Sequence, residues 1–284
     1  MDDLDEHPDG AIGVIGGSGF YTWLAEDSSF TDVSEHRLTT PFGDPSAPLT
    51  VGRLDGRRIV FLPRHGVAHE YLPHRLPYRA NLWAMHELGV RKLVSASAVG
   101  SLEPGYGPGT VVVPDQLVDR TSGRDQTFFD RVGATSQQPI HVSFADPYCP
   151  ALRAAMVEGS STVRDGGTLV VIDGPRFSTR AESRWYAAQG WSVINMTGHP
   201  EAVLARELQI CYATACLVTD LDAGVSVGTG VTADEVFAEF ARNLPSFAAL
   251  LVSALRSIDP DDGCECATGD HDVELALKEA TCPG

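Results

Sequence analysis

The 284-residue sequence lacks any long apolar run, and it is poor in basic residues and in cysteine. Since no stretch reaches 18 consecutive apolar residues, no transmembrane helix is predicted. The first six residues, MDDLDE, lack the basic-then-apolar order of a signal peptide, so we expect a cytoplasmic protein. Lysine and arginine number 21 against 38 acidic residues. The resulting net charge of −17 disfavours nucleic acid and anionic membranes as partners.

Six cysteines are few for this length, and three of them, Cys264, Cys266 and Cys282, stand near the C-terminus together with His271. Two interpretations are open for this segment, a metal site or a loosely packed tail. A Cys-x-Cys pair without a second matching pair is a weak indication of metal binding. We therefore expect no metal site, and a loosely packed tail after residue 258.

Short apolar runs alternate with helical patterns along most of the chain. The predicted strands are 13–16, 49–54, 58–63, 92–97, 110–113, 168–172, 192–195 and 210–219, and the predicted helices are 78–88, 179–188, 200–208 and 233–258. Pro245 should kink or split the last helix. This alternation predicts one α/β domain over residues 1–258, with a mixed, mostly parallel sheet flanked by helices. Residues 259–284 form a tail of unknown role.

A glycine-rich turn, GGSG at residues 16–19, follows the first predicted strand. No lysine follows these glycines, as a mononucleotide P-loop requires, and the third glycine of a dinucleotide fingerprint is missing. Two interpretations stay open. The turn is a plain strand-to-helix connection, or its backbone N–H groups and the Ser18 hydroxyl hold a small anion.

Three further motifs place anion-binding side chains after strands. Arg64 and His65 stand in LPRHGVAH, Ser97 in SASAVGSL, and Thr197 at a predicted helix start in NMTGHPE. Arginine offers several planar donors to an oxyanion, and a helix N-terminus favours negative charge. The alternatives are a surface cluster of ion pairs for the first motif and tight sheet packing of small residues for the second.

Two acids, Asp220 and Asp222, follow the most apolar predicted strand in TDLDAG. A period of two places both carboxylates on one face, where each raises the pKa of the other. A protonated carboxyl group can donate to a leaving group. A helix cap or a divalent-metal loop is the alternative.

Taken together, these segments resemble the trimeric purine nucleoside phosphorylase family and, within it, the 5′-methylthioadenosine phosphorylases. The resemblance runs from about residue 11 to residue 258. Seven blocks occur in family order: GVIGGSGFY, PRHG, PYRANLWAM, VVVPDQLVDRTSGR, GPRFSTRAES, NMTGHPEAVLARE and TDLDAG. The resemblance implies the single-domain nucleoside phosphorylase fold, a mixed sheet with flanking helices, and a homotrimer.

The resemblance also implies a role for each matching residue. The implied phosphate ligands are Ser18, Arg64, His65, Ser97, Ala98 and Thr197. The implied nucleoside contacts are Phe177, Ser178, Met196, Asp220, Asp222 and Val236, with His141 lent by a neighbouring subunit. Asp220 and Asp222 are the implied catalytic acids, which select 6-aminopurines and assist the leaving base.

The implied reaction is phosphorolysis of 5′-methylthioadenosine to adenine and 5-methylthioribose-1-phosphate, within purine and methionine salvage. Phosphate is a co-substrate, and no metal or organic cofactor is required. Residues 223–236 depart from the family's usual charged segment, and small apolar Ala233 and Val236 suit an uncharged 5′ group. The same chemistry on 5′-methylthioinosine, another 6-oxopurine nucleoside or a 5′-halo-5′-deoxyadenosine stays open. A nucleoside hydrolase and a non-catalytic nucleoside sensor are alternatives from other classes.

Overall fold

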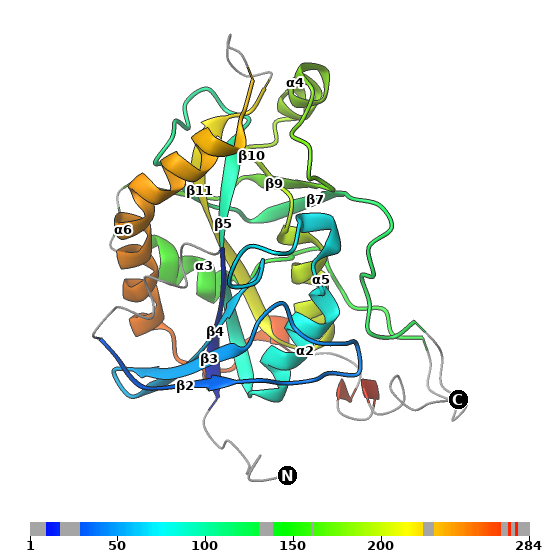
Figure 1. Ribbon diagram of the computed structural model, residues 1–284, viewed down its shortest axis with the longest axis vertical. Helices are drawn as coiled ribbons and strands as arrows, with labels where there is room; N and C mark the ends of the chain where they lie inside the picture. Colours follow the sequence, from blue (N-terminus) through cyan, green and yellow to red (C-terminus); the bar gives the residue numbers. More distant parts are fainter. Residues whose placement is uncertain are drawn as a thin grey trace.

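Helices cover both faces of a central sheet in the computed structural model, which describes residues 10–17, 29–130, 139–158, 160, 162–223, 230–267, 272–273 and 276–277. On one face lie α3 (Pro150–Val157) and α6 (Ala233–Ser257), and on the other α2 (Tyr78–Glu87) and α5 (Gly198–Glu207) (Figure 1). The fifth helix of the described residues, α4 (Arg180–Ala188), lies beyond one end of the sheet (Figure 1).

The sheet of the described residues has 11 strands of mixed direction. Its main path is β2 (Phe30–His36), β3 (Leu49–Leu54), β4 (Arg57–Pro63), β1 (Ala11–Gly16), β5 (Val90–Ser101), β10 (Val193–Asn195), β9 (Thr168–Ile172) and β7 (Gln116–Arg120). Off this path, β11 (Cys211–Leu221) pairs with β5 and β6 (Val111–Val113), and β6 pairs with β8 (Val163–Asp165). Most pairs are parallel; β2–β3, β3–β4, β5–β10 and β6–β11 are antiparallel.

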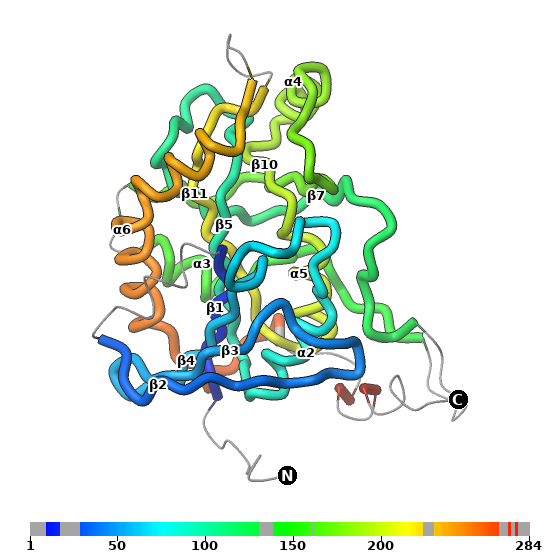
Figure 2. Tube along the Cα trace, viewed as in Figure 1, coloured from blue at the N-terminus to red at the C-terminus, as the bar shows by residue number. Residues whose placement is uncertain are grey.

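The long strand β5 has two different neighbours along one edge. Near its start, β1 runs parallel to it, with Ile15 opposite Ser95; near its end, β10 runs antiparallel, with Ile194 opposite Gly100. The carboxyl ends of β1 and β10 therefore point toward each other across the middle of β5 (Figure 2). Loops that follow strands carry the binding groups of many α/β proteins, so this convergence positions the site.

Two apolar cores fill the space between the sheet and its helices. One packs α3 and α6 against β11 through residues such as Leu152, Phe247 and Leu251, and the other packs α2 and α5 through Leu82 and Leu204. Burial of both sheet faces explains the nearly continuous apolar runs of the central strands.

The predicted α/β architecture is confirmed, and every predicted strand and helix overlaps an observed one. Strands β2, β7 and β8 and helix α3 were not predicted. Five consecutive residues of β2 are exposed, and β7, β8 and α3 are only 5, 3 and 8 residues long. Pro245 does not split the last helix, since α6 continues through it as one element of 25 residues, and the expected kink stays a prediction. None of the described helices is long and apolar enough to cross a membrane.

The described part of the C-terminal segment packs against the domain, contrary to the loosely packed tail that we expected. Asp261 accepts a hydrogen bond from the backbone N–H of Gly10 at 3.0 Å. Cys264 and Cys266 pack against the α3–α6 core, and Leu277 is buried in the other core. The side chains of Cys264, Cys266 and Leu277 make this contact. It was not predicted because most other residues of the segment are polar.

Candidate active site

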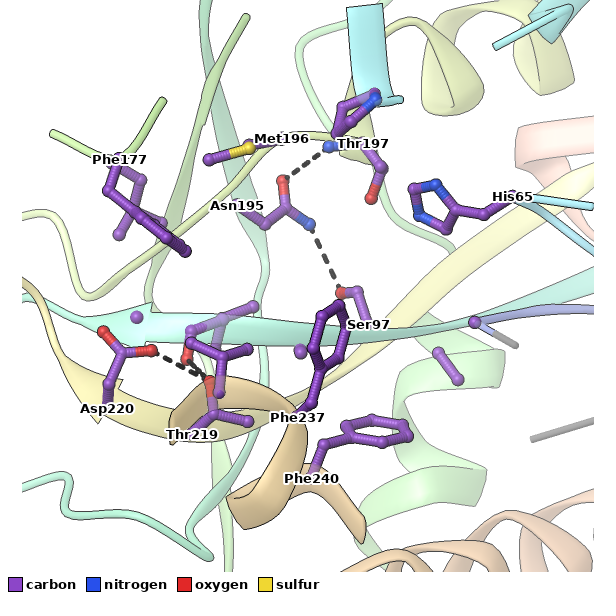
Figure 3. A pocket seen from close by; sticks show the side chains of 18 of the residues that line it. His65, Ser97, Phe177, Asn195, Met196, Thr197, Thr219, Asp220, Phe237 and Phe240 are labelled. Atoms are coloured by element: carbon purple, nitrogen blue, oxygen red, sulfur yellow. Dashed lines mark hydrogen bonds between the residues drawn. The ribbon is translucent and has the colours of Figure 1, made fainter. Parts of the chain in front are cut away.

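A cavity of about 440 Å³ opens where the carboxyl ends of β1, β4 and β10 meet the middle of β5 and the end of β11. Figure 3 shows its side chains converging from these segments. Its lining includes these predicted site residues: Arg64, His65, Ser97, Ala98, Phe177, Ser178, Met196, Thr197, Asp220, Asp222 and Val236. The structure therefore brings together residues that are up to 172 positions apart in the sequence.

The polar side chains of the cavity fall into two groups at opposite ends. His65, Ser97 and Thr197 lie together at one end, and Asp220 lies near Phe177 at the other (Figure 3). Met196 lies between the two ends (Figure 3). This separation provides one place for an anion and another for a group that receives a proton or a hydrogen bond.

Asp220 is the best candidate for a proton donor. Burial raises its pKa to about 6, and the nearby charge of Asp222 adds to the effect. One carboxylate oxygen accepts a hydrogen bond from the Thr219 hydroxyl at 2.9 Å, which fixes the orientation of the group. The other carboxylate oxygen lies so close to Gly100 that a Cβ atom at position 100 would be only 3.1 Å from it. Glycine at this position therefore leaves space for the Asp220 side chain. The charge of the second acid is therefore a smaller cause than burial, contrary to our expectation.

Ser178 and Asp222 add polar side chains to the same end of the cavity as Asp220. Ser178 Oγ and Asp222 Oδ2 are buried without a well-oriented hydrogen-bond partner among the described residues. Burial also raises the pKa of Asp222. Hydrogen bonds from the Ser183 and Ser178 side chains partly offset this rise, and the atoms without a well-oriented partner leave room for a hydrogen bond to a ligand.

The helix-cap alternative for the two acids does not agree with the geometry, whereas the metal-loop alternative also involves residues 224–229, which lie outside the described residues. The caps of the adjacent helices α4 and α6 are Thr179 and Thr232. Within the described ranges, the only group of three or more potential metal ligands consists of cysteines. The acids therefore stand as cavity residues, and neither caps a described helix.

Asn195 organises the opposite end of the cavity. Its Nδ2 donates to Ser97 Oγ at 3.3 Å, and the Ser97 hydroxyl also lies 3.8 Å from Cys216 Sγ, a weak acceptor that a ligand oxygen can replace. Its Oδ1 accepts from the backbone N–H groups of Thr197 and Gly198 at 3.3 and 3.2 Å. The first N–H group of α5, that of Gly198, was expected to face an anion and is thus already used. The Thr197 hydroxyl makes no capping bond to the described helix and lines the cavity.

His65 is held as a neutral ring. Gly66, with a φ of 85°, turns the chain directly after it, and the His65 Nδ1 lies 2.9 Å from the carbonyl oxygen of Tyr71. Burial, followed by the charge of Arg64, lowers the pKa of His65 to about 4. In the neutral tautomer with hydrogen on Nδ1, Nε2 is an acceptor.

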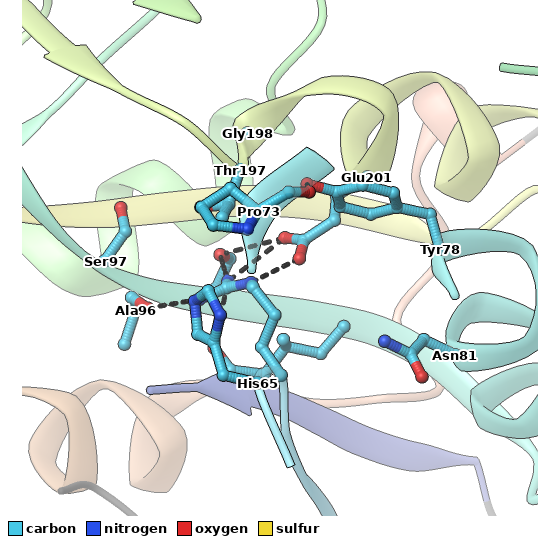
Figure 4. A network of polar contacts seen from close by, with 12 residues as sticks. His65, Pro73, Tyr78, Asn81, Ala96, Ser97, Thr197, Gly198 and Glu201 are labelled. Carbon is cyan, nitrogen blue, oxygen red and sulfur yellow. Dashed lines mark hydrogen bonds and ion pairs between the residues drawn. The ribbon is translucent and has the colours of Figure 1, made fainter. Parts of the chain in front are cut away.

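Arg64 is fully buried and paired with Glu201 of α5, a residue that the sequence analysis did not select. Figure 4 shows the carboxylate of Glu201 within this network of polar contacts. Arg64 Nε and Nη2 donate to the two carboxylate oxygens, the latter at 3.1 Å. Burial opposes the charge, but the carboxylate of Glu201 outweighs it and raises the pKa of Arg64. Nη1 carries two hydrogens and has one acceptor among the described residues, the Ala96 carbonyl at 3.1 Å. The surface ion-pair alternative is therefore wrong.

One face of α6 forms an apolar wall of the cavity. Thr232 and Glu235 begin this helix with reciprocal capping bonds. Val236, Phe237, Phe240, Ala241 and Leu244 then line the cavity. Phe237 is 56% exposed and lies edge-on to His69, which stacks on His65. Ala233, the second small residue predicted here, is exposed and is absent from the lining.

Two predicted site residues, Ser18 and His141, are not among the described residues that line this cavity. Ser18 lies outside the described residues, so its expected phosphate contact stays a prediction. His141 is exposed and does not line the cavity of its own chain, and its contribution to a neighbouring subunit stays a prediction. The most important residues that sequence analysis missed are Asn195, Glu201 and Phe237. Asn195 alone carried a signal, as a polar residue directly after a buried strand.

Comparison with known proteins identifies the relatives of this chain. Residues 11–256 match the model of the phosphorylase superfamily. The S-methyl-5′-thioadenosine phosphorylase of Mycolicibacterium smegmatis is 60% identical, over 94% of this chain and 98% of its own. The purine nucleoside phosphorylase of Streptomyces coelicolor is 51% identical, over 94% and 97%.

A solved structure agrees with these relatives. A variant of the adenosine/methylthioadenosine phosphorylase of Schistosoma mansoni, in complex with adenine, superposes with a TM-score of 0.82 at 32% identity. The match covers 96% of this chain and 99% of that one. The chain belongs to the phosphorylase superfamily, as a member with the nucleoside phosphorylase fold.

Proposed function

We propose that this protein catalyses the phosphorolysis of 5′-methylthioadenosine to adenine and 5-methylthioribose-1-phosphate. One observation carries the proposal: a single cavity holds hydroxyl groups, a histidine and an arginine at one end and a buried acid with a pKa of about 6 at the other. Its relatives of 60% and 32% identity carry the names of methylthioadenosine phosphorylases.

At the acid end, the protein stabilises the departing base. A phosphate oxygen attacks C1′, the bond from C1′ to N9 breaks, and its electron pair passes to the purine. Asp220, when protonated, donates its proton or a hydrogen bond to N7 and so offsets the negative charge. Ser178 and Asp222 bond the remaining polar edge of the base, since their side chains line the same end of the cavity as Asp220 and Asp222 Oδ2 has no well-oriented partner among the described residues. Carboxylate acceptors favour the 6-amino group of adenine over a 6-oxo group.

At the other end, phosphate is held mainly by neutral groups. The Ser97 and Thr197 hydroxyls donate to phosphate oxygens, and the free Nη1 hydrogen of Arg64 adds a charged donor. His65 Nε2 accepts the hydrogen of the phosphate hydroxyl, or takes up a proton when the dianion raises the pKa of the ring. We propose Ser18 as a further hydroxyl ligand and Ala98 as a contact of phosphate and base.

The apolar wall of α6 selects an uncharged 5′ substituent. Val236 lies in this wall, and Phe237 and Phe240 extend it. A methylthio group buries its apolar surface there, whereas a 5′ phosphate or carboxylate would lose hydration without gaining a partner. Met196 lies between the two ends of the cavity and contacts the ribose.

We further propose a cytoplasmic homotrimer that acts in purine and methionine salvage, with no metal in the reaction. A neighbouring subunit would bring its His141 to the 5′ end, where the half-exposed Phe237 leaves the wall open to cover. Sedimentation as a monomer at micromolar concentration would contradict the assembly.

A second candidate keeps the chemistry and changes the nucleoside. The relative at 51% identity is named purine nucleoside phosphorylase, so other purine nucleosides need a direct test. Turnover of 5′-methylthioadenosine, 5′-methylthioinosine, adenosine, inosine and a 5′-chloro analogue should be compared with and without phosphate. We expect 5′-methylthioadenosine to give the highest kcat/KM and no turnover without phosphate. Activity on inosine alone would overturn the adenine preference, and equal rates without phosphate would indicate a hydrolase.

A further inference from the structure

Four cysteines lie together in a cluster far from the cavity. The Sγ atoms of Cys149, Cys211, Cys264 and Cys266 all lie within 4.8 Å of one another. Cys264 lies 3.6 Å from Cys149 and 3.0 Å from Cys266, which lies 3.2 Å from Cys211. None of the four is in a disulfide. The sequence analysis could not find this group, because only two of the four belong to the Cys-x-Cys pair.

Three separate segments supply the four thiols. Cys149 is the N-cap residue of α3, and Cys211 is the first residue of β11; both are fully buried. Cys264 and Cys266 stand at the short helix η2 (Glu265–Ala267), and both are half-buried. The cluster thus joins the C-terminal segment to the core, with its outer two thiols on the solvent side where an ion can enter.

We propose that these four cysteines form a mononuclear metal site that binds zinc. Zinc favours four thiolates in a tetrahedron with bonds of about 2.3 Å, which gives sulfur–sulfur edges of about 3.8 Å. The observed separations of 3.0 to 3.6 Å approach this edge, and the limit of 4.8 Å covers every pair. Modest side-chain rotation that widens the three closest pairs would complete the tetrahedron.

Other uses of four thiols fit the geometry less well. The four sulfurs form one group instead of two isolated pairs, since Cys266 lies near both Cys264 and Cys211. Two disulfides would also need an oxidant, and their sulfurs would have to approach to about 2.0 Å. An iron–sulfur cluster is bulkier than a single ion and holds its cysteines farther apart.

Binding of the ion would deprotonate the four thiols and release their protons to solvent. Because the protein fills all four positions, the ion keeps no open site for water or substrate, which is typical of a structural zinc site. The positive end of α3 at Cys149 stabilises the remaining negative charge. The last cavity residue of α6, Leu244, lies about three and a half turns before the end of that helix, so the ion stabilises the fold without taking part in turnover.

Metal content measured on the full chain tests this proposal independently of activity. The protein should be expressed with added zinc, purified under anaerobic reducing conditions and analysed by mass spectrometry of its metals. We expect about one zinc per chain, and replacement by cobalt should give the absorption bands of a tetrahedral thiolate complex. Removal of zinc by a chelator should lower the Tm, and added zinc should restore it.

Cys266→Ser and Cys264→Ser should each lose most of the zinc. Cys216→Ser is the matched control, because Cys216 is also buried in β11 but lies outside the cluster, and it should keep the full amount. If a cluster variant does not fold, the cobalt spectrum of the unmodified chain still shows whether four thiolates bind a metal ion. A reduced chain that takes up neither zinc nor cobalt would overturn the proposal. So would undiminished zinc in both cluster variants, or a metal-free native chain carrying two disulfides among these residues.

Discussion

The buried carboxyl group of Asp220 leads to a quantitative prediction for pH dependence. With a pKa of about 6, half of the Asp220 side chains are protonated at pH 6. At pH 8 only about one in a hundred is protonated, since the pH is then two units above the pKa. If the protonated form assists the leaving base, the Asp220-dependent part of kcat/KM should fall about 50-fold between these two values.

Asp220→Asn separates this effect from the ionisation of phosphate. Asparagine keeps the shape and an oxygen that can accept from Thr219 at 2.9 Å, but it does not titrate. The ratio of kcat/KM between the unmodified protein and Asp220→Asn should therefore decline with pH, while changes in the co-substrate cancel. Initial rates of adenine release, separated by liquid chromatography at saturating phosphate, measure the ratio from pH 5 to pH 8.5. A ratio that stays constant, or rises with pH, would refute the assignment of Asp220 as the acid.

Three further predictions concern the other side chains of the cavity. Arg64→Ala leaves Glu201 buried without its partner and should destabilise the fold by about 3 to 5 kcal/mol, measured by urea unfolding. The double variant Arg64→Met with Glu201→Gln should recover most of this stability while the KM for phosphate stays raised; an unchanged KM would contradict the role of Arg64. Val236→Asp should lower kcat/KM for 5′-methylthioadenosine at least about 10-fold relative to adenosine, because the methylthio group would meet a charge. Since the fold holds His65 neutral down to about pH 4, whereas an unfolded histidine takes up its proton near pH 6.5, stability should be lost as pH falls between these values. The loss through His65 is up to about 3 kcal/mol, and His65→Gln should abolish it in unfolding experiments at each pH.

The architecture and most cavity residues could be predicted because both depend on local signals. Buried central strands leave continuous apolar runs, and functional side chains follow them directly, as Asp222 follows β11 and Arg64 follows β4. Strand β2 left no such run, because it lies at the edge of the sheet and is mostly exposed.

The electrostatics of the site could not be predicted, because they depend on contacts distant in sequence. Glu201 follows a proline at the start of α5, where an acidic residue is ordinarily interpreted as favourable to the helix N-terminus. Its actual partner, Arg64, is 137 residues away in the sequence. The carboxylate of Glu201 neutralises the positive charge of Arg64, which we had expected to be available to an anion. Similarly, Cys149 and Cys211 look like buried small residues until the fold places them beside Cys264.

The opposed approach of β1 and β10 along one edge of β5 has a consequence for how the site tolerates mutation. Between Ser95 and Gly100, no strand of the described residues pairs with that edge of β5, and the segment lines the cavity. A ligand in this cavity would lie where a further strand is absent, next to main-chain groups that every amino acid shares; one of them, the Ala96 carbonyl, already accepts from Arg64. Alanine scanning would leave these groups intact and so underestimate their contribution to binding. Substrate preference can then be altered through the surrounding side chains, while the peptide framework that receives the ligand persists.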